Sequence, residues 1–244
     1  MSHELIVIGA SGIPIYSIKV DPDSLLRSGF YKAIYDFGRQ QNSCLSRIEF
    51  LNGRCAYCHY FEDKDLLFFI TIDVYHFKEG IMLKMQRLYD QIFLDLDLPK
   101  QGEICPSEEL ISNVEYILRE KLVREQILTK QENIKEVIQD ILQSSEIKAV
   151  SIHTLDNTPI LFAGSDINSI TNWLIKWNLA HPPAPYEFEF GNYLDDKTLQ
   201  GIIMNSGISF KNDKNFILYY IFGESANLGF HMDWLSVKLN KIIG

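Results

Sequence analysis

The order of the predicted elements is the feature that most constrains the fold of this chain. The first half is predicted to run strand, strand, helix, three strands, and two helices. The second half is predicted to run helix, two strands, helix, three strands, helix, so moving its first helix to its end reproduces the first order. We therefore predict an α+β fold with two domains, 1–129 and 130–244, each a five-stranded antiparallel sheet flanked by helices.

Hairpin signals and periodicity place the elements of the first half. Five strands are predicted at 4–9, 14–20, 45–51, 54–61 and 66–74, with Asn52-Gly53 as the strongest hairpin signal. A helix after the second strand carries an apolar stripe at helical spacing, which we expect to face the core: Leu26, Phe30, Ala33, Ile34 and Phe37. Two more helices are predicted, one spanning 81–92 and one spanning 107–128.

The second half shows the same kind of signals. A helical stripe covers 134–142, and strands at 149–153 and 159–163 flank a turn at Asp156-Asn157. A helix with Ile170, Trp173, Leu174 and Trp177 on its apolar face follows, and a proline-rich loop covers 181–185. Three strands are then predicted at 186–190, 199–205 and 216–222, and the last helix spans 227–243.

Charge and hydropathy exclude several classes of function. The chain has 23 basic and 32 acidic side chains, a net charge of −9, which is unsuited to binding a nucleic-acid backbone or an anionic membrane. No apolar run approaches the roughly 20 residues of a membrane-spanning helix. The start of the chain lacks the features of a secretory signal, so we expect a cytoplasmic protein with reduced thiols.

Two short motifs imitate cofactor sites. Cys55-Ala56-Tyr57-Cys58-His59 matches a haem-attachment pattern, but it lies within a predicted strand, where residues three apart point to opposite faces. The same geometry excludes a zinc site that adds Cys44. Gly9-Ala10-Ser11-Gly12 lacks the third glycine and the helix of a dinucleotide site. The six histidines are scattered, and we predict no catalytic residues, no cofactor and no metal.

Both halves resemble known domain families. The first half, with Gly12-Ile13-Pro14-Ile15-Tyr16-Ser17 opening its second strand, resembles a longin domain (ββαβββαα). The second half resembles the roadblock/LC7 family (αββαβββα), on its 155–160 hairpin and on the segment Gly223-Glu224-Ser225-Ala226-Asn227-Leu228-Gly229 between the last strand and the last helix. The second half departs from roadblock domains at Asn157-Thr158, where many of them have a glycine, and in its proline-rich loop.

The resemblance implies a non-enzymatic protein-interaction module. Longin and roadblock domains occur in scaffolds and exchange-factor complexes that bind small Ras-like GTPases near membranes, so a GTPase is the expected partner, and peripheral membrane recruitment stays open. The alternative is a trafficking adaptor whose longin half binds a peptide or helix of another protein. For the partner site we select Tyr16, Lys19, Tyr31 and Tyr35, because the two helix tyrosines lie opposite the apolar stripe and should face outward or contact the other domain. The alternative is that both are ordinary surface tyrosines.

A dimer interface is predicted on the helix of the second half that carries the tryptophans. Trp173 and Trp177 share a face, and Ile170 extends it. The helix is apolar on more than one side, which indicates burial on more than one side. The resemblance to roadblock domains, which commonly dimerise through this helix, implies a homodimer or a heterodimer. The alternative is that these residues pack only into their own core.

Overall fold

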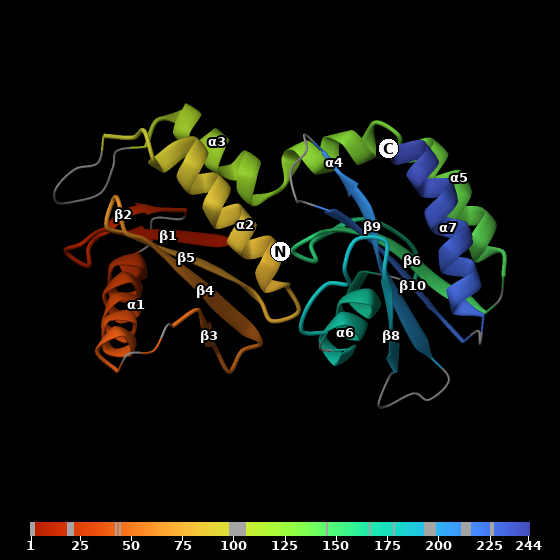
Figure 1. Cartoon of the computed structure of the whole chain (residues 1–244), viewed down its shortest axis with the longest axis horizontal. Coiled ribbons are helices and arrows are strands. Elements are labelled where there is room, and N and C mark those ends of the chain that lie inside the picture. The colour runs from red at the N-terminus through yellow and green to blue at the C-terminus, as the bar shows by residue number, and fades with distance from the viewer. Residues whose placement is uncertain are drawn as a thin grey trace. The chain divides into compact units, whose positions relative to one another are not determined.

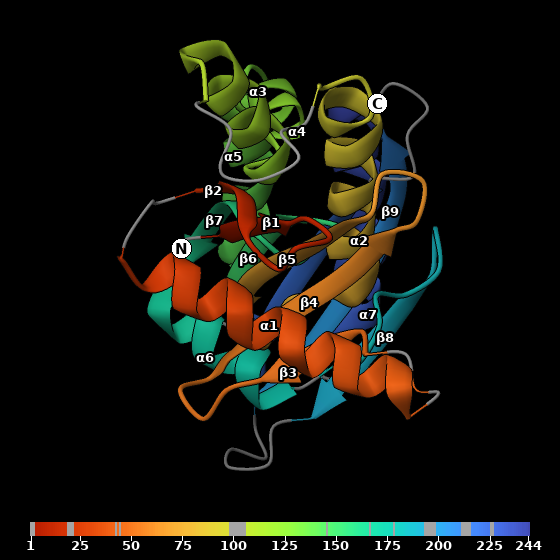
Figure 2. The same ribbon diagram turned by 90° about the vertical axis from the view of Figure 1, so that its left-hand side faces the viewer.

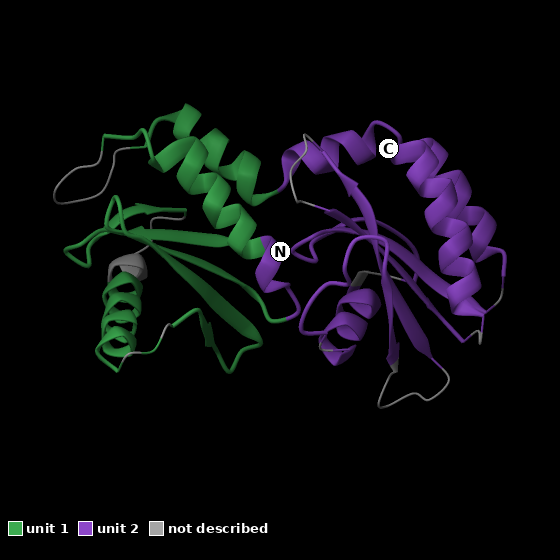
Figure 3. Ribbon diagram, viewed as in Figure 1, with its two compact units in different colours: residues 1–74, 81–119 green, residues 75–80, 120–244 purple. Residues whose placement is uncertain are grey.

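The computed structural model describes residues 3–18, 22–41, 43, 45–97, 106–144, 146–165, 167–177, 179–192, 199–210, 216–224 and 227–244. The chain divides into two compact units (Figure 3). Unit 1 comprises Met1–Val74 and Ile81–Arg119, and unit 2 comprises Tyr75–Gly80 and Glu120–Gly244. The predicted domain boundary at 129/130 lies ten residues after the division at Arg119/Glu120, and it stays a prediction about where independently folding domains meet.

Unit 1 contains one five-stranded antiparallel sheet in the order β2-β1-β5-β4-β3 (Figure 1). Its elements are β1 (Glu4–Ile8), β2 (Pro14–Ser17), α1 (Pro22–Gln40), β3 (Arg47–Glu49), β4 (Arg54–Phe61), β5 (Leu66–Asp73), α2 (Lys78–Leu88), the π-helical turn η1 (Tyr89–Phe93) and α3 (Glu108–Leu118). The first three residues of α2 belong to unit 2.

The sheet of unit 1 has a hydrophobic core on each face. Leu5 and Val7 of β1 pack with residues of α2, η1 and α3 on one face. Ile6 and Ile8, which alternate with them, pack with Tyr31 of α1 on the other face. Figure 2 shows α1 lying across the strands of this sheet. The unit is therefore a three-layer structure, with α1 on one side of the sheet and the later helices on the other.

Unit 2 repeats this topology with later elements of the chain. Its sheet has the order β7-β6-β10-β9-β8 and is antiparallel throughout. The elements are α4 (Lys121–Leu128), α5 (Gln131–Leu142), β6 (Ile147–Thr154), β7 (Pro159–Gly164), α6 (Ile167–Trp177), β8 (Phe188–Asn192), β9 (Gln200–Ser209), β10 (Phe216–Gly223) and α7 (Leu228–Ile243). Helices α4, α5 and α7 cover one face of the sheet, and α6 covers the other.

The predicted fold class is confirmed. Both sheets are five-stranded and antiparallel. In each unit, the helix that follows the second strand is the one helix on its face of the sheet among the described residues. The prediction of a single helix over 107–128 is wrong, because the structure has two helices there, α3 and α4. Glu120 lies between them with a backbone φ of 48°, a left-handed conformation that a continuous α-helix does not contain.

Several strand boundaries also differ from the prediction; β9, for example, ends at Ser209 and not at Asn205. Strand β3 is shorter than the predicted 45–51, and β8 begins two residues after the predicted start at Tyr186. Tyr186 has a φ of 67° and belongs to a turn. Of the helices in the described part of the chain, none is both long enough and apolar enough to cross a membrane.

Candidate functional site

Helix α1 packs on the sheet of unit 1 through the face opposite to the one predicted. Ser28 and Tyr31 are buried against the sheet. The exposed fractions of Leu26, Phe30 and Phe37 are 74%, 53% and 64%. The prediction that the apolar residues form the core face and that Tyr31 points outward is therefore wrong, and α1 presents an apolar surface away from its sheet.

The inward face of α1 is held by groups that combine an apolar ring with a polar end. The ring of Tyr31 stacks on Phe69 of β5, with centroids 4.4 Å apart, and its hydroxyl lies 3.3 Å from Thr71 Oγ1. The ring of Tyr35 lies 5.7 Å from that of Tyr60. The tyrosine hydroxyl thus gives the hydroxyl of Thr71 a hydrogen-bond partner, which a phenylalanine at position 31 would not provide.

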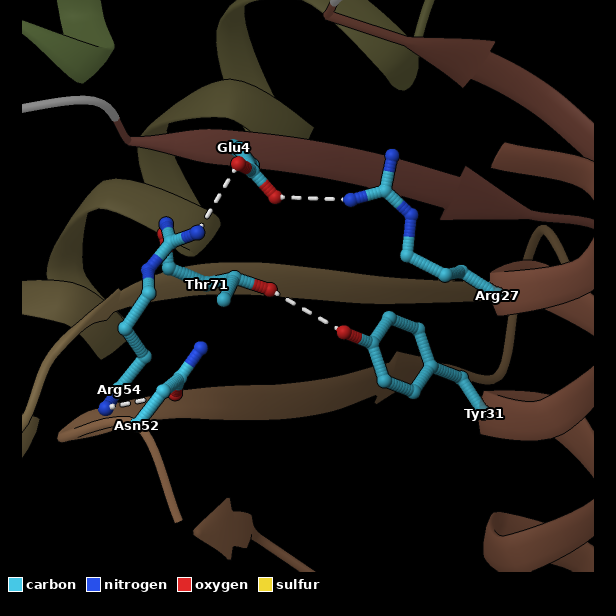
Figure 4. A network of polar contacts seen from close by, with 6 residues as sticks. All are labelled: Glu4, Arg27, Tyr31, Asn52, Arg54 and Thr71. Carbon is cyan, nitrogen blue, oxygen red and sulfur yellow. Dashed lines mark hydrogen bonds and ion pairs between the residues drawn. The ribbon is translucent and has the colours of Figure 1, made fainter. Parts of the chain in front are cut away.

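A charged group at the edge of the same face adds to this attachment (Figure 4). Glu4 of β1 accepts a hydrogen bond from Arg27 of α1 at 3.1 Å and another from Arg54 of β4 at 3.0 Å. Arg54 also donates to the carbonyl of Thr71 at 3.3 Å. One carboxylate therefore links α1 to strands β1 and β4, which lie on either side of β5, and it favours this side of α1 facing inward.

The outward face of α1 is a continuous apolar strip, called here the α1 stripe: Leu26, Phe30, Ala33 and Phe37. It spans about 16 Å along the helix, at 1.5 Å per residue. Gly29 lies beside it, with open space where a side chain would stand. The charges nearest the stripe are paired within unit 1, as Lys32 Nζ lies 2.6 Å from Asp36 Oδ1 and Arg27 contacts Glu4.

The predicted partner residues do not form one surface. Tyr16 lies in the core on the opposite face of the sheet from Tyr31, with its ring 5.8 Å from that of Phe93. Burial, with a smaller contribution from Glu115, raises the pKa of Tyr16 to about 12. Tyr35 is half-buried, and Lys19 lies outside the described residues. The large apolar side chains that α1 exposes are instead those of the α1 stripe, which sequence periodicity had assigned to the core.

The predicted dimer residues of α6 are used by their own unit. Ile170 is fully buried, and the ring of Trp173 lies 4.8 Å from that of Phe222 on β10. Trp177 lies over the paired residues Gly191 and Gly201, where a Cβ atom would come within 2.0 Å and 2.8 Å of its indole. Both indoles therefore pack on their own sheet while staying partly exposed, which favours the alternative that they serve their own core, and the dimer interface stays a prediction.

Beneath α6 lies a buried polar network that the sequence analysis missed. Ser151 and His153 are two residues apart on β6 and so share a face, and Ser151 Oγ lies 2.6 Å from His153 Nε2. His153 Nδ1 lies 2.9 Å from Asn157 Oδ1, which also accepts from the Tyr220 hydroxyl at 2.7 Å. The Asn157 amide donates to the carbonyl of Tyr75 at 2.9 Å.

The serine and histidine of this network have the spacing of a nucleophile and its base, but their surroundings indicate a structural role. Both side chains are completely buried. Burial lowers the pKa of His153 to about 4, so the imidazole is neutral near pH 7. Because Nδ1 faces two acceptors on Asn157, its proton lies there and Nε2 accepts from Ser151. The adjoining cavity, beside Trp177 and Tyr220, measures about 10 Å³, the size of one water molecule.

The two cysteines of the haem-like motif point to opposite faces of the sheet, as predicted. Cys55 belongs to the core covered by α2 and α3, and Cys58 to the core covered by α1. Cys58 Sγ lies 2.9 Å from the carbonyl oxygen of Leu45. One bound group cannot contact both sulfur atoms in this arrangement. Cys44 and Cys105 lie outside the described residues.

Within the described part of unit 1, the α1 stripe is the largest group of exposed apolar side chains on one element. In unit 2, the side chains of Ser151 and His153 are fully buried. The resemblance of the two halves to longin and roadblock domains stays a hypothesis about the family of each half. The scan of family models finds no match to this chain, and no curated protein matches it significantly.

Proposed function

We propose that this protein is a non-enzymatic protein-interaction module and that the α1 stripe is a contact surface for another protein chain. The observation that carries the proposal is the orientation of α1. Its polar and tyrosine face is attached to its own sheet, and three large apolar side chains are left on water. Contiguous apolar patches of this size on soluble proteins commonly mark interaction sites.

The partner class that we propose is a small Ras-like GTPase, with this chain as part of a scaffold, an exchange-factor complex or a trafficking complex. The support is the resemblance of the two halves to longin and roadblock domains. The net charge of −9 also favours encounter with a basic surface. Tyr16 and Tyr31 are not assigned to this contact, because both are buried.

The test is binding of the full chain to Ras-like GTPases of the native organism in GDP-bound, GTP-bound and nucleotide-free forms. A tether binds the GDP and GTP forms alike, whereas an exchange factor binds the nucleotide-free form best. Phe30→Glu places a charge on the stripe without touching the core, and it shows whether α1 is part of the GTPase site. Failure to bind any of these GTPases in all three states would contradict the proposal.

The spacing of the α1 stripe favours a second candidate function. Side chains at positions 26, 30, 33 and 37 are the pattern by which one helix packs along another. An adaptor that binds a helix of a trafficking partner would use this pattern. Isothermal titration with helical peptides from proteins that co-purify with the chain tests this candidate, with Phe37→Glu expected to abolish the heat of binding.

A further inference from the structure

The α1 stripe has the sequence spacing of a helix-pairing seam. Leu26, Phe30, Ala33 and Phe37 are separated by four, three and four residues, which is the spacing of alternating d and a positions in a heptad. All four are on the exposed side of α1. We propose that the stripe binds a second copy of this chain, with the two α1 helices packed antiparallel about a two-fold axis.

Residue sizes along the stripe fit this arrangement. An antiparallel two-fold pair centred between Tyr31 and Lys32 places each a position against a d position of the other copy. Phe30 then meets the partner's Ala33, and Leu26 meets the partner's Phe37, so that the large ring at the centre faces the smallest side chain. Gly29, with open space at its Cβ position, leaves room beside that ring. The stripe is therefore complementary to itself.

The charges beside the stripe are compatible with self-pairing. The flanking positions of the heptad are Arg27 and Ile34 on one side and Gly29 and Asp36 on the other. In the antiparallel pair, Arg27 comes beside the partner's Ile34, and Asp36 beside the partner's Gly29. No like charges meet, although each copy has a net charge of −9.

The available area indicates a weak, reversible dimer. With 150–250 Å² for a large side chain, the exposed parts of Leu26, Phe30 and Phe37 amount to roughly 400 Å² per copy. Two copies would bury about 800 Å² from these side chains, and the flanking residues add to this. Specific interfaces begin at about 1,200 Å². We therefore expect a dissociation constant in the micromolar range, so that monomer and dimer exchange with concentration.

This inference rests on the proposed role of the α1 stripe as a protein contact, and its test requires no GTPase. Sedimentation equilibrium of the full chain from about 1 to about 100 µM should show a monomer–dimer equilibrium. Phe30→Glu should weaken it about 30-fold or more, as expected for a central apolar anchor. The control, Ile175→Glu, charges an exposed side chain of α6 and should leave it unchanged.

The register is tested by exchanging the two central side chains. Phe30→Ala alone leaves two small residues opposed, and Ala33→Phe alone opposes two rings, so each single variant should dimerise more weakly than the wild type. An equimolar mixture of the two should form a heterodimer tighter than either homodimer, because every ring then meets an alanine. The double variant F30A/A33F should regain the wild-type affinity. Both sites are exposed, so the fold is retained.

Three results would overturn the proposal: a wild-type chain that stays monomeric over this range, a dimer insensitive to Phe30→Glu, or a dimer abolished by Ile175→Glu, which would place the interface on α6. The GTPase proposal fails independently of these results. A dimer that binds no GTPase contradicts the partner class alone, and a monomer that binds a GTPase contradicts the dimer alone.

Discussion

Helices α1 and α6 occupy the same place in the two units, yet they use their apolar residues in opposite ways. Each follows the second strand of its unit and crosses a face of a five-stranded sheet with the same strand order. Helix α6 directs Trp173 and Trp177 into the sheet. Helix α1 directs Tyr31 into the sheet and leaves Phe30 and Phe37 outside. Because the topology does not require an exposed apolar face, the α1 stripe needs an explanation beyond the fold.

The sheets beneath the two helices explain the difference. Under α6, two paired glycines leave a slot that an indole fills. Under α1, Thr71 offers a hydroxyl, and Glu4 offers a carboxylate at the edge of the same face. A large apolar ring is stabilised in the first environment, and a ring with a polar end in the second. The sheet, and not the apolarity of the helix, selects which face is buried.

The largest expected effect comes from emptying the slot under α6. Trp177→Ala removes the indole from Gly191 and Gly201 and should lower the free energy of unfolding by about 3–5 kcal/mol, the usual cost of truncating a packed aromatic residue. The measurement is urea unfolding followed by circular dichroism. Ile175→Ala, on the exposed side of α6, is the control and should cost little. Equal losses in the two variants would mean that Trp177 is not an anchor.

The next effect concerns the polar network under α6. The unfolded chain binds a proton at His153 near pH 6.5, whereas the folded chain binds it only near pH 4. Between these values the unfolded state holds more protons, so stability falls as the pH falls, by about 3 kcal/mol in total from this group. NMR titration of the imidazole checks this directly. A midpoint near 6.5 for His153 would contradict the buried neutral state.

A smaller effect is expected at Glu4, the first residue of strand β1. Glu4→Gln keeps the shape of the side chain but removes its charge between Arg27 and Arg54, and it should lower the free energy of unfolding by about 1–2 kcal/mol. Glu49→Gln breaks an exposed pair with Arg47 in the same unit and should cost less than about 0.5 kcal/mol. Chemical denaturation measures the free energy of unfolding of both variants. Equal losses in the two would mean that Glu4 does not help to hold α1 on the sheet.

The smallest effect is expected on the α1 stripe. Phe30→Ala, measured at a concentration low enough to keep the chain monomeric, should change the free energy of unfolding by less than about 0.5 kcal/mol, because the ring is exposed. This change resembles Trp177→Ala in chemistry but differs in site, so the two values compare the helices directly. A loss of several kcal/mol from Phe30→Ala would mean that the ring is packed within the chain.

Local signals were sufficient to predict the strands and their order, although they did not predict the break between α3 and α4. Alternation along β4 correctly placed Cys55 and Cys58 on opposite faces, and Asn52-Gly53 correctly marked the turn between β3 and β4. The alternation of side chains along a strand and the residue preferences of a tight turn depend only on residues close in the sequence. Both can therefore be predicted from one sequence. The same alternation would have paired Ser151 with His153, had it been applied to polar residues.

The sequence by itself therefore determined two α+β units, their strand alternation and the place of each crossing helix. Only the tertiary structure decided which side of α1 faces inward. Its periodicity offers two faces about 180° apart, and the choice depends on Thr71 of β5, forty residues from Tyr31, and on Glu4, which is paired with Thr71 on the neighbouring strand β1. The slot for Trp177 likewise depends on Gly191 and Gly201, which become neighbours only when β8 pairs with β9. Helix periodicity is a local property, whereas the surface that a helix meets is assembled from distant strands.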